Sequence, residues 1–573
     1  MLSNLRQGPT LKEVAFAGFP GSNNRETIDG DLAVRVFGLL PVVDSGYHQG
    51  RYGERSRQRL DLAILSLFQS FRKVYIGEQV MHSSKVYTRL QERLGLKDHA
   101  MILNLMLSKI AINLKVYGSC DDIITQTLNL FQDLAAGYTS GKLLLKLDFT
   151  SYILQHHTAE HFAFLDDPAN SRSRTTFYFT LARLLFVEDT AAKFKAFVLV
   201  GLGAACSNGA DPGALRTSVQ RQVVIGLFRD LRGITMATNS RRNYGLLFDW
   251  LYPAHFPTLR ACLEAWADSP DVTTAMLKFM AEFALNKTQR LTFDSSSPNG
   301  ILLFREVSKV LVSYGTRVVA SAPTSDPYGQ RYKGIWICLD LLKTALAGNY
   351  VNFGVFELYG DPALKDALDI TMKMALSVPL ADIMAYRKVG KAFFGLLDVL
   401  CSNHTHVIAN YDTPTFAFLM TALDGGLKSL DVVISSQCAT AVDNLAGFYF
   451  KAVQANGSET PPAAAQKVAE HLQQRPELLP TLLTTLFEIV LFEDCPNQWS
   501  LSRPMLSLIL INEQIYTALR DRIVAAHPRD RQAHLSACLD KLMADVQRNL
   551  ESKNRDKFTQ NLTNARHEFR SKR

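Results

Sequence analysis

The sequence HTAEH at residues 157–161 has the residue types and spacing of one class of zinc-peptidase motif. If this segment were helical, His157 and His161 would share one face and could bind the same metal ion. Glu160 would then stand beside them as a general base. A zinc site needs further ligands, and no clear third ligand can be placed from the sequence. The alternative interpretation is a polar helix end before the apolar run at residues 162–165, and we favour it.

A second short pattern, Gly201-Leu202-Gly203, resembles the start of a nucleotide-binding glycine loop. The third glycine of that fingerprint is missing, because Cys206 occupies its position, and no strand-to-helix unit surrounds it. A helix that ends at a flexible loop is the simpler interpretation. Phosphate-loop and serine-hydrolase motifs are also absent from the sequence. The sequence therefore predicts a binding protein rather than an enzyme, with no catalytic residue, no metal and no cofactor.

Basic residues gather at two places where an acidic partner could bind. One lies near a predicted helix pair around residue 230, and its alternative is a solvated face or ion pairs between neighbouring repeats. The other, residues 554–573, has six Lys and Arg residues against two Asp and Glu. Such a segment suits either an interaction tail or a helix C-terminus, where the dipole favours cations. The candidate partner-contact residues are Arg229, Arg232, Arg241, Arg242, Arg555 and Lys557.

These residues lie in a chain whose apolar residues repeat with a helical period from about residue 59 to residue 569. Near the start of this region, Ile64, Leu67 and Phe71 mark an apolar face, and Asp61 falls on the polar face. A final stripe predicts one more continuous helix. It consists of Leu535, Leu539, Leu542, Val546 and Leu550. Two short strand-like pieces, 74–80 and 334–339, are flanked by helical pattern, so we predict that they are helical too.

Composition excludes several classes of protein. The chain has 573 residues, of which 47% are hydrophobic, and this is too apolar for a disordered protein. The net charge of +8 is spread too thinly to predict a nucleic-acid-binding surface. The eight cysteines are far apart, which predicts reduced thiols in the cytosol or nucleus. No signal peptide is recognisable, and the longest apolar run is shorter than the about 20 residues of a membrane span.

A helical chain of this length exceeds the roughly 250–300 residues at which a single core stops growing. The usual solution is a stack of helical pairs, in which each pair covers the apolar face of its neighbour. The loop spacing fits pairs of about 40–47 residues, as in HEAT or armadillo repeats. We therefore predict an all-α fold, a HEAT-repeat α-solenoid of antiparallel helix pairs. The predicted domains are a disordered or unrelated segment at 1–27, the solenoid at 28–550, and a basic C-terminal helix or tail at 551–573.

Several longer segments go beyond periodicity, and they follow one another in a fixed order and spacing. The segment QRLTFD at 289–294 leads into SPNGILLFRE at 297–306. The other segments are 83–96, 157–162, 229–234, 248–253, 350–361, 492–504 and 553–562. Over residues 28–573 the chain resembles the exportins, nuclear transport receptors of the importin-β (karyopherin) superfamily. The resemblance also implies that the HTAEH segment is part of the solenoid, with no metal.

The resemblance implies a HEAT-repeat superhelix that binds protein cargo together with the GTP-bound form of the small GTPase Ran. It implies passage through the nuclear pore on Phe-Gly nucleoporins, and shuttling between nucleus and cytoplasm. Superfamily members usually act as monomers, and no direct contact with nucleic acid or membrane is implied. An alternative is a HEAT-repeat scaffold for another assembly that does not depend on Ran.

The chain departs from the family in its length. Exportins are considerably longer, and the extra length is an N-terminal arch that makes much of the contact with Ran. Residues 1–27 do not resemble that arch. We expect either a truncated chain, which we favour, or a receptor that has lost its Ran-gated half. The sequence therefore predicts no Ran-contact residue.

Overall fold

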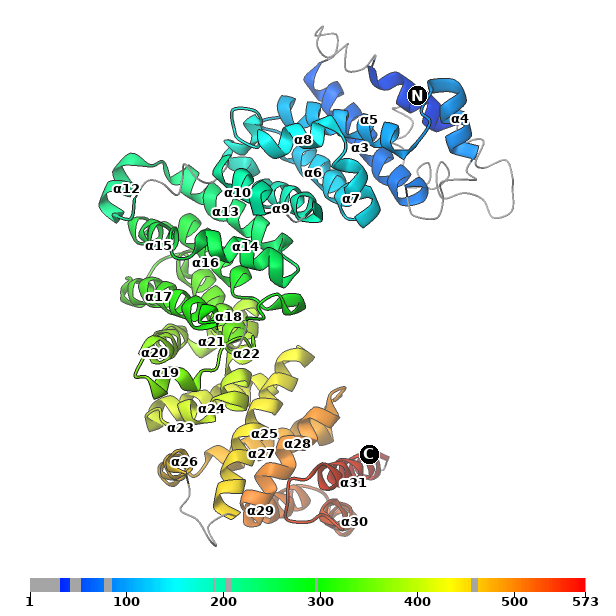
Figure 1. Cartoon of the computed structure of the whole chain (residues 1–573). Coiled ribbons are helices and arrows are strands. Elements are labelled where there is room, and N and C mark those ends of the chain that lie inside the picture. Colours follow the sequence, from blue (N-terminus) through cyan, green and yellow to red (C-terminus); the bar gives the residue numbers. More distant parts are fainter. Residues whose placement is uncertain are drawn as a thin grey trace. The chain divides into compact units, whose positions relative to one another are not determined.

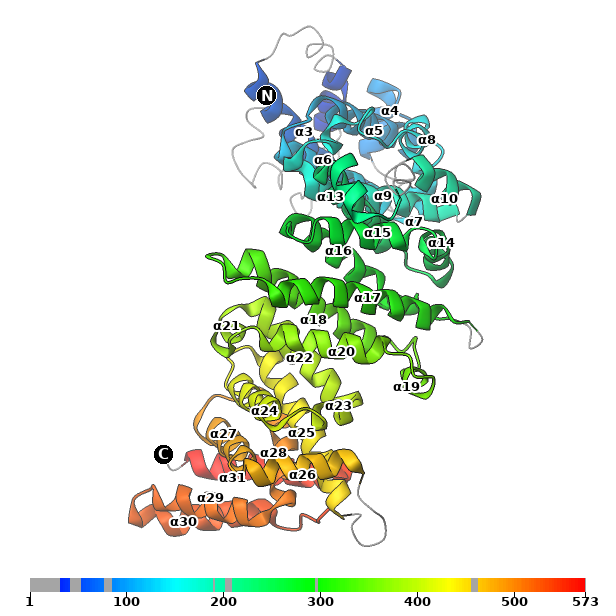
Figure 2. The same cartoon turned by 90° about the vertical axis from the view of Figure 1, so that its left-hand side faces the viewer.

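The computed structural model describes residues 31–41, 53–76, 85–188, 191–200, 209–293, 297–454 and 462–571. Most of these residues are helical and none of them lies in a strand, which confirms the predicted all-α class. The chain divides into two compact units, Met1–Glu306 and Val307–Arg573. Within each unit the helices stack in successive layers (Figures 1 and 2). The segment 1–27, predicted to be disordered or unrelated, lies outside the described residues.

The helices of the N-terminal unit are a helix over residues 31–41, α3 (Glu54–Tyr75), α4 (Lys85–Leu94), α5 (His99–Val116), α6 (Asp121–Ala135), α7 (Tyr138–Leu144), α8 (Asp148–Gln155), η2 (Ala163–Leu165), η3 (Pro168–Asn170), α9 (Ser171–Glu188), α10 (Ala191–Val198), α12 (Pro212–Ser218), α13 (Arg221–Ala237), α14 (Arg241–Leu251), α15 (Phe256–Ala265), α16 (Pro270–Phe283) and η5 (Lys287–Gln289). The next helix, α17 (Asn299–Ala320), contains the boundary between the two units.

The helices of the C-terminal unit are η6 (Tyr328–Tyr332), α18 (Lys333–Leu346), α19 (Gly354–Leu358), α20 (Ala363–Leu376), α21 (Leu380–Ala385), α22 (Arg387–Asn403), α23 (Thr405–Ala409), α24 (Thr413–Leu427), α25 (Val432–Gln454), α26 (Ala463–Gln474), α27 (Leu478–Phe492), α28 (Gln498–Ile511), α29 (Glu513–Ala525), α30 (Arg529–Asp540), η8 (Lys541–Met543) and α31 (Ser552–Ser571). The strand-like piece at 334–339 lies inside α18, which confirms that it is helical.

A row of successive helices runs through each unit. In the N-terminal unit α3, α6, α9, α13 and α16 each pack along the next, and in the C-terminal unit α18, α22, α25, α28 and α31 do the same. Other helices, such as α5, α15 and α24, pack against members of these rows. Apolar side chains of α13, such as Phe228 and Leu231, are fully buried, and α13 packs against α9 and α16. This arrangement is that of a helical-repeat fold, in which each pair is covered by its neighbours.

Local sequence sets many of the helix starts. The carboxylates of Asp98, Asp211 and Asp412 each accept a hydrogen bond from a backbone N–H in the first turn of α5, α12 and α24, at 2.9, 2.7 and 3.0 Å. Ser240 does the same for α14, at 3.2 Å. These side chains satisfy backbone donors that have no partner within the helix.

The structure corrects the placement of Asp61. The apolar face of α3 is buried as predicted, but Asp61, expected on the polar face, is fully buried as well. Its carboxylate lies 2.5 Å from the Lys109 ammonium group and accepts a 2.5 Å hydrogen bond from the Tyr117 hydroxyl. Burial of this charge is possible because the neighbouring helix α5 supplies the opposite charge.

The predicted continuous helix through residues 535–550 is also wrong. Helix α30 ends at Asp540, and Asp545 has a positive φ of 59°. The Asn554 amide group donates to the carbonyls of Gln547 and Asn549, at 2.7 and 2.6 Å, and accepts from the backbone N–H of Gln547 at 2.8 Å. These bonds hold residues 544–551 as a loop, which apolar periodicity alone does not reveal.

Candidate functional site

The HTAEH segment is a turn rather than a helix. Helix α8 ends before it, and the backbone N–H groups of His161 and Phe162 both donate to the Thr158 carbonyl, at 3.1 and 2.9 Å. His157 is fully buried, whereas His161 is half-buried and lies against the ring of His156, with centroids 4.8 Å apart. The two histidines therefore do not share the face that a zinc ion requires. Within the described ranges, no three His, Cys, Asp or Glu side chains are grouped to hold a metal ion.

His157 instead belongs to an aromatic cluster. Its ring centroid lies 4.2 Å from that of Phe197, and its Nδ1 lies 3.3 Å from the Tyr178 hydroxyl. That hydroxyl donates to the His157 carbonyl at 2.9 Å. Burial disfavours the charged imidazolium, so it lowers the pKa of His157 from 6.5 to about 4. The neutral ring is a packing element of the N-terminal unit.

This pKa shift predicts a loss of stability in acid. Between pH 6.5 and about 4 the unfolded chain protonates His157 while the folded chain does not. Its contribution is therefore complete above pH 6.5 and is lost as the pH falls through 4, with a full size of roughly 3 kcal/mol. We expect His157→Gln to weaken the pH dependence of urea unfolding between pH 7 and about pH 4.5. An unchanged pH dependence in His157→Gln would contradict the assignment.

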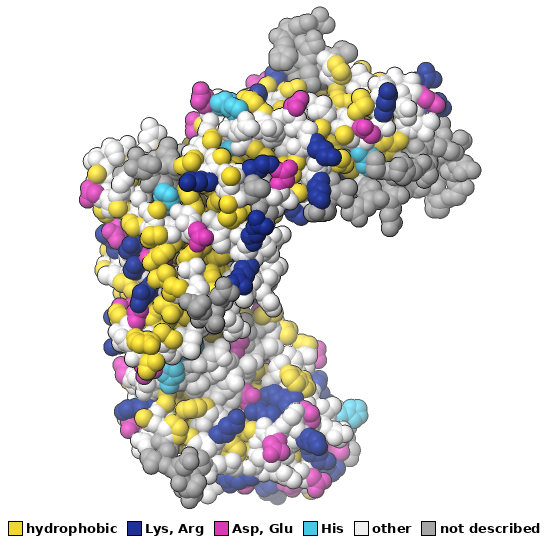
Figure 3. Space-filling view, viewed as in Figure 1, with side chains coloured by type: hydrophobic (Ala, Val, Ile, Leu, Met, Phe, Trp, Pro, Cys, Tyr) yellow, Lys and Arg dark blue, Asp and Glu magenta, His cyan; other side chains and the backbone are white. Residues whose placement is uncertain are grey.

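Basic side chains recur over the helices from α6 to α14 on the face drawn in Figure 3. The contacts of these side chains distinguish basic residues that stabilise the fold from basic residues that could bind a partner. Arg290 is the clearest structural case, with a side chain that is 1% exposed. It follows α16, in the segment 289–294 that contributed to the exportin resemblance.

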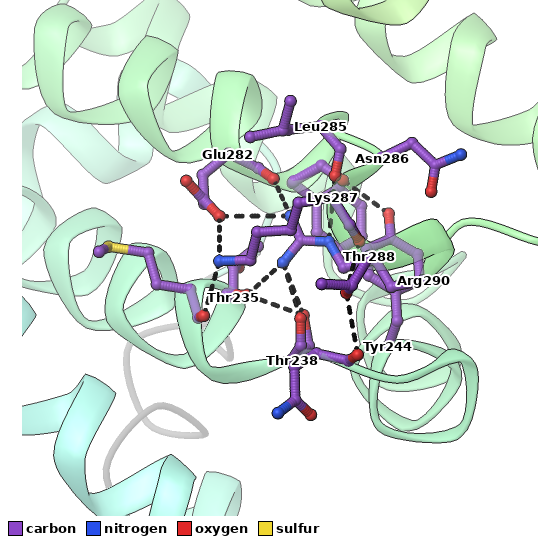
Figure 4. Close-up of polar contacts among 12 residues, drawn as sticks. Thr235, Thr238, Tyr244, Glu282, Leu285, Asn286, Lys287, Thr288 and Arg290 are labelled. Carbon is purple, nitrogen blue, oxygen red and sulfur yellow. Dashed lines mark hydrogen bonds and ion pairs between the residues drawn. The ribbon is translucent and has the colours of Figure 1, made fainter. Parts of the chain in front are cut away.

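The Arg290 guanidinium group binds the C-terminal ends of two helices (Figure 4). It donates to the carbonyls of Thr235 and Thr238 at the end of α13, at 2.7 and 2.9 Å, and to the carbonyl of Leu285 after α16, at 3.0 Å. It also donates to the carbonyl and carboxylate of Glu282. Burial lowers the pKa of Arg290, and the Glu282 carboxylate opposes this shift. The cation therefore lies at the carbonyl ends of both helices, where the helix dipole favours a positive charge.

Other basic side chains in both units also donate hydrogen bonds to carbonyls near the C-terminal end of a helix. Lys287 donates to the carbonyl of Met236 at 2.8 Å, beside the Arg290 contacts. Further examples are Arg183 to Ala136 (2.7 Å), Arg216 to Ala265 (2.9 Å), Arg566 to Val490 (2.7 Å) and Arg570 to Leu491 (3.2 Å). The last two cap α27 from α31, so part of the basic C-terminal segment is used within the C-terminal unit. Helix α31 also packs against α28 and α30.

The two candidates on α31 have different surroundings. The Arg555 guanidinium group donates to both carboxylate oxygens of Asp443 on α25, each at 2.9 Å, and both side chains are mostly buried. The Lys557 ammonium group is 40% exposed and lies 3.8 Å from Asp545. Contact of either residue with a partner stays a prediction, but Arg555 already has an internal role.

This difference predicts unequal effects on stability. Arg555→Met leaves the Asp443 carboxylate without its cation, and we expect it to lower the free energy of unfolding by about 2 kcal/mol. Lys557→Met removes an exposed ion pair and should cost less than about 1 kcal/mol. Chemical denaturation of the two variants measures the difference. Equal costs would show that the ion pair with Asp443 does not stabilise the unit.

The four candidates near residue 230 also separate into two pairs. Arg241 and Arg242 are exposed at the start of α14, and both interact within the chain. Arg229 and Arg232 are half-buried on α13, and the Nε atom of each is buried with no hydrogen-bond partner. Their contact with a partner is likewise a prediction.

Two residues of this region were not found from the sequence. Asp230, which lies between Arg229 and Arg232 in the sequence, is fully buried. Arg174 of α9 donates two hydrogen bonds to its carboxylate, one from Nε at 2.9 Å and a shorter one from Nη2. Burial raises the pKa of the Asp230 carboxyl to about 6, against the attraction of Arg174. Arg172, two residues earlier on α9, is exposed. The only sequence signal that Arg172 and Arg174 have different surroundings was their i, i+2 spacing, which places the two side chains on different sides of α9.

Other features of the sequence add no site. The Gly201-Leu202-Gly203 pattern and Cys206 lie outside the described residues. The other seven cysteines are free, and all except Cys120 are buried. Across the part of the chain that is described, no helix has both the length and the apolar character needed to cross a bilayer.

Comparisons with known proteins show which proteins the chain is similar to. A family model described as "Exportin-7-like, TPR domain" matches residues 17–173, and this match begins inside the segment 1–27. Exportin-7-A of Xenopus laevis is 41% identical over 565 residues, which cover 96% of this chain. The chain is related to the exportin-7 proteins. This relationship confirms the resemblance drawn from the collinear segments.

Further relatives agree. Ran-binding protein 17 of Mus musculus is 39% identical over 95% of this exportin-7-like chain, and Exportin-7 of Dictyostelium discoideum is 34% identical over 96% of it. The chain spans about half the length of these relatives, with 51%, 51% and 55% of the three proteins covered. Among solved structures, an engineered protein aligns with 80% of the chain at 14% identity, but the TM-score of 0.29 is too low to indicate a shared fold.

Proposed function

We propose that this chain is part of a nuclear export receptor that binds protein cargo cooperatively with Ran-GTP. The observation that carries the proposal is 41% identity to Exportin-7-A over 96% of the chain. The name Ran-binding protein 17 of another relative supports Ran as a partner. The receptor would shuttle between nucleus and cytoplasm as a monomer, with Phe-Gly nucleoporins as its partners in the pore. No catalytic residue takes part in this function.

A stack of helix pairs suits this task. Each pair contacts only its neighbours, so small adjustments between pairs add up to a change of curvature. If cargo and Ran-GTP favour the same curvature, each raises the affinity of the other. Such coupling is typically about 1–3 kcal/mol, or roughly 5- to 150-fold in affinity.

The test compares this 573-residue chain with the product of the whole gene, each immobilised and exposed to nuclear extract. Ran-GTP, Ran-GDP or no Ran is added, and captured proteins are quantified by mass spectrometry. We expect Ran-GTP, and not Ran-GDP, to raise cargo capture by the whole product. A response of the whole product alone would place the Ran contact outside these residues. Indifference of both proteins to the nucleotide would favour a HEAT-repeat scaffold without Ran dependence.

A further inference from the structure

Many basic side chains of the N-terminal unit bind a helix end or a carboxylate, but one cluster does not. It consists of Arg172 on α9 with Arg229 and Arg232 on α13. Within the described part of the chain none of the three forms an ion pair or a side-chain hydrogen bond. This distinguishes the cluster from Arg174, Arg183 and Arg290, whose partners are given above.

Packing of the two helices brings the three arginines together. The Thr175 hydroxyl of α9 donates to the Arg229 carbonyl of α13 at 3.2 Å, so the two helices are level at this point. Arg172 is one turn before Thr175 on α9, and Arg232 is one turn after Arg229 on α13. Residues three apart on a helix share a face.

The surface of α13 explains why these side chains point away from the core. Buried residues cover most of the helix, and the half-buried ones at 222, 229, 232 and 236 form a single stripe. Asp230, the nearest carboxylate in the sequence, lies on the other side and is bound by Arg174. The fold therefore neutralises one arginine of this region and leaves three cations beside one another.

Electrostatics agree with this geometry. Burial lowers the pKa of Arg229, and the nearby cations of Arg232 and Arg172 lower it further, against the weaker effects of Asp271 and Asp230. Like charges that repel each other in the free protein are stabilised when an anion binds between them. Carboxylates suit guanidinium groups, because each can accept two parallel hydrogen bonds.

We propose that Arg172, Arg229 and Arg232 form a binding surface for an acidic segment, rich in Asp and Glu, of a partner protein. A protein partner is favoured over nucleic acid, because the net charge of +8 over 573 residues provides no long basic stripe along which a phosphate backbone could lie. The inference is independent of the proposed function, since it holds whether or not the partner is a transport cargo.

The test measures binding of a fluorescent deca-glutamate peptide to the full 573-residue chain by anisotropy, at about 50 and 150 mM salt. The cluster variant is R172Q/R229Q/R232Q. The control variant, R55Q/R59Q/R93Q, removes three exposed arginines of α3 and α4 and makes the same change in net charge. We expect the cluster variant to bind about tenfold more weakly at the lower salt, and the control to change by less than about twofold.

Thermal unfolding verifies that both variants fold, and the cluster variant should be at least as stable as the parent because repulsion is relieved. An equal loss of affinity in the two variants would overturn the proposal, as would an unaltered chain that does not bind deca-glutamate. Duplex DNA of equal charge is the second probe. If it binds more tightly than the peptide and loses affinity only in the cluster variant, the surface is one for nucleic acid and the proposed partner is wrong.

Discussion

Replacing Arg290 with methionine is expected to lower the free energy of unfolding of the N-terminal unit by about 3–5 kcal/mol. The change removes the guanidinium donor from the carbonyls of Thr235 and Thr238, and it removes one of the two cations beside the Glu282 carboxylate. The guanidinium ion also lies over the ring of Tyr244, 5.5 Å from its centroid. Chemical denaturation, with hydrogen exchange of α13 and α16 to locate the loss, measures this effect.

Two variants serve as controls for Arg290→Met. Arg290→Lys keeps the charge but replaces a planar group having five donors with a single ammonium group, so we expect an intermediate loss of about 2 kcal/mol. Arg55→Met removes an exposed arginine of α3 and should change stability by less than about 0.5 kcal/mol. A cost below 1 kcal/mol for Arg290→Met would show that water replaces the lost donors and that the Arg290 contacts contribute little to the stability of the fold.

Gly233→Ala is expected to destabilise the same unit by about 3 kcal/mol, a large effect for one added methyl group. A Cβ atom at Gly233 of α13 would lie 2.4 Å from the Thr175 carbonyl oxygen and 2.9 Å from the Phe179 backbone nitrogen of α9. Both neighbours are backbone atoms, so the clash is relieved only if the helices move apart. Gly226, seven residues earlier, similarly leaves room for the Arg174 side chain that reaches Asp230.

Gly245 of α14 provides the matched control. A Cβ atom there would meet no atom within 4 Å. Because alanine restricts the unfolded chain more than glycine does, we expect Gly245→Ala to stabilise the protein by about 0.5–1 kcal/mol. Thermal unfolding of the two variants should therefore shift in opposite directions. If Gly233→Ala left the stability unchanged, α9 and α13 would not be in close contact at Gly233.

The function of the charged residues was the least predictable part of the candidate site. Arg229 and Arg232 were named from a local cluster of charge, whereas Arg172, which completes it, was not, because it lies on another helix. Arg555 was named from the basic composition of residues 554–573, yet its partner Asp443 is 112 residues away in sequence. A local pattern records the sign of a charge but not the group that faces it.

Much of the architecture was nevertheless determined by the sequence alone. Apolar residues such as Ile64, Leu67 and Phe71 recur at the helical period, and this periodicity is a property of the local chain, so it predicted the helices and their buried faces. Chain length then required a stack of pairs rather than one core. The collinear segments revealed the resemblance to the exportins, because a long match in a fixed order does not depend on knowing the contacts.

Only the tertiary structure decided what the polar side chains do. It buried Asp61 against Lys109 and made the HTAEH segment a turn. It also placed Arg290 against Thr235 near the end of α13, 55 residues earlier in the chain. The physical reason is that the free energy of a buried charge or donor depends on its partner. That partner comes from a neighbouring layer of the stack, and its position is set only when the layers pack.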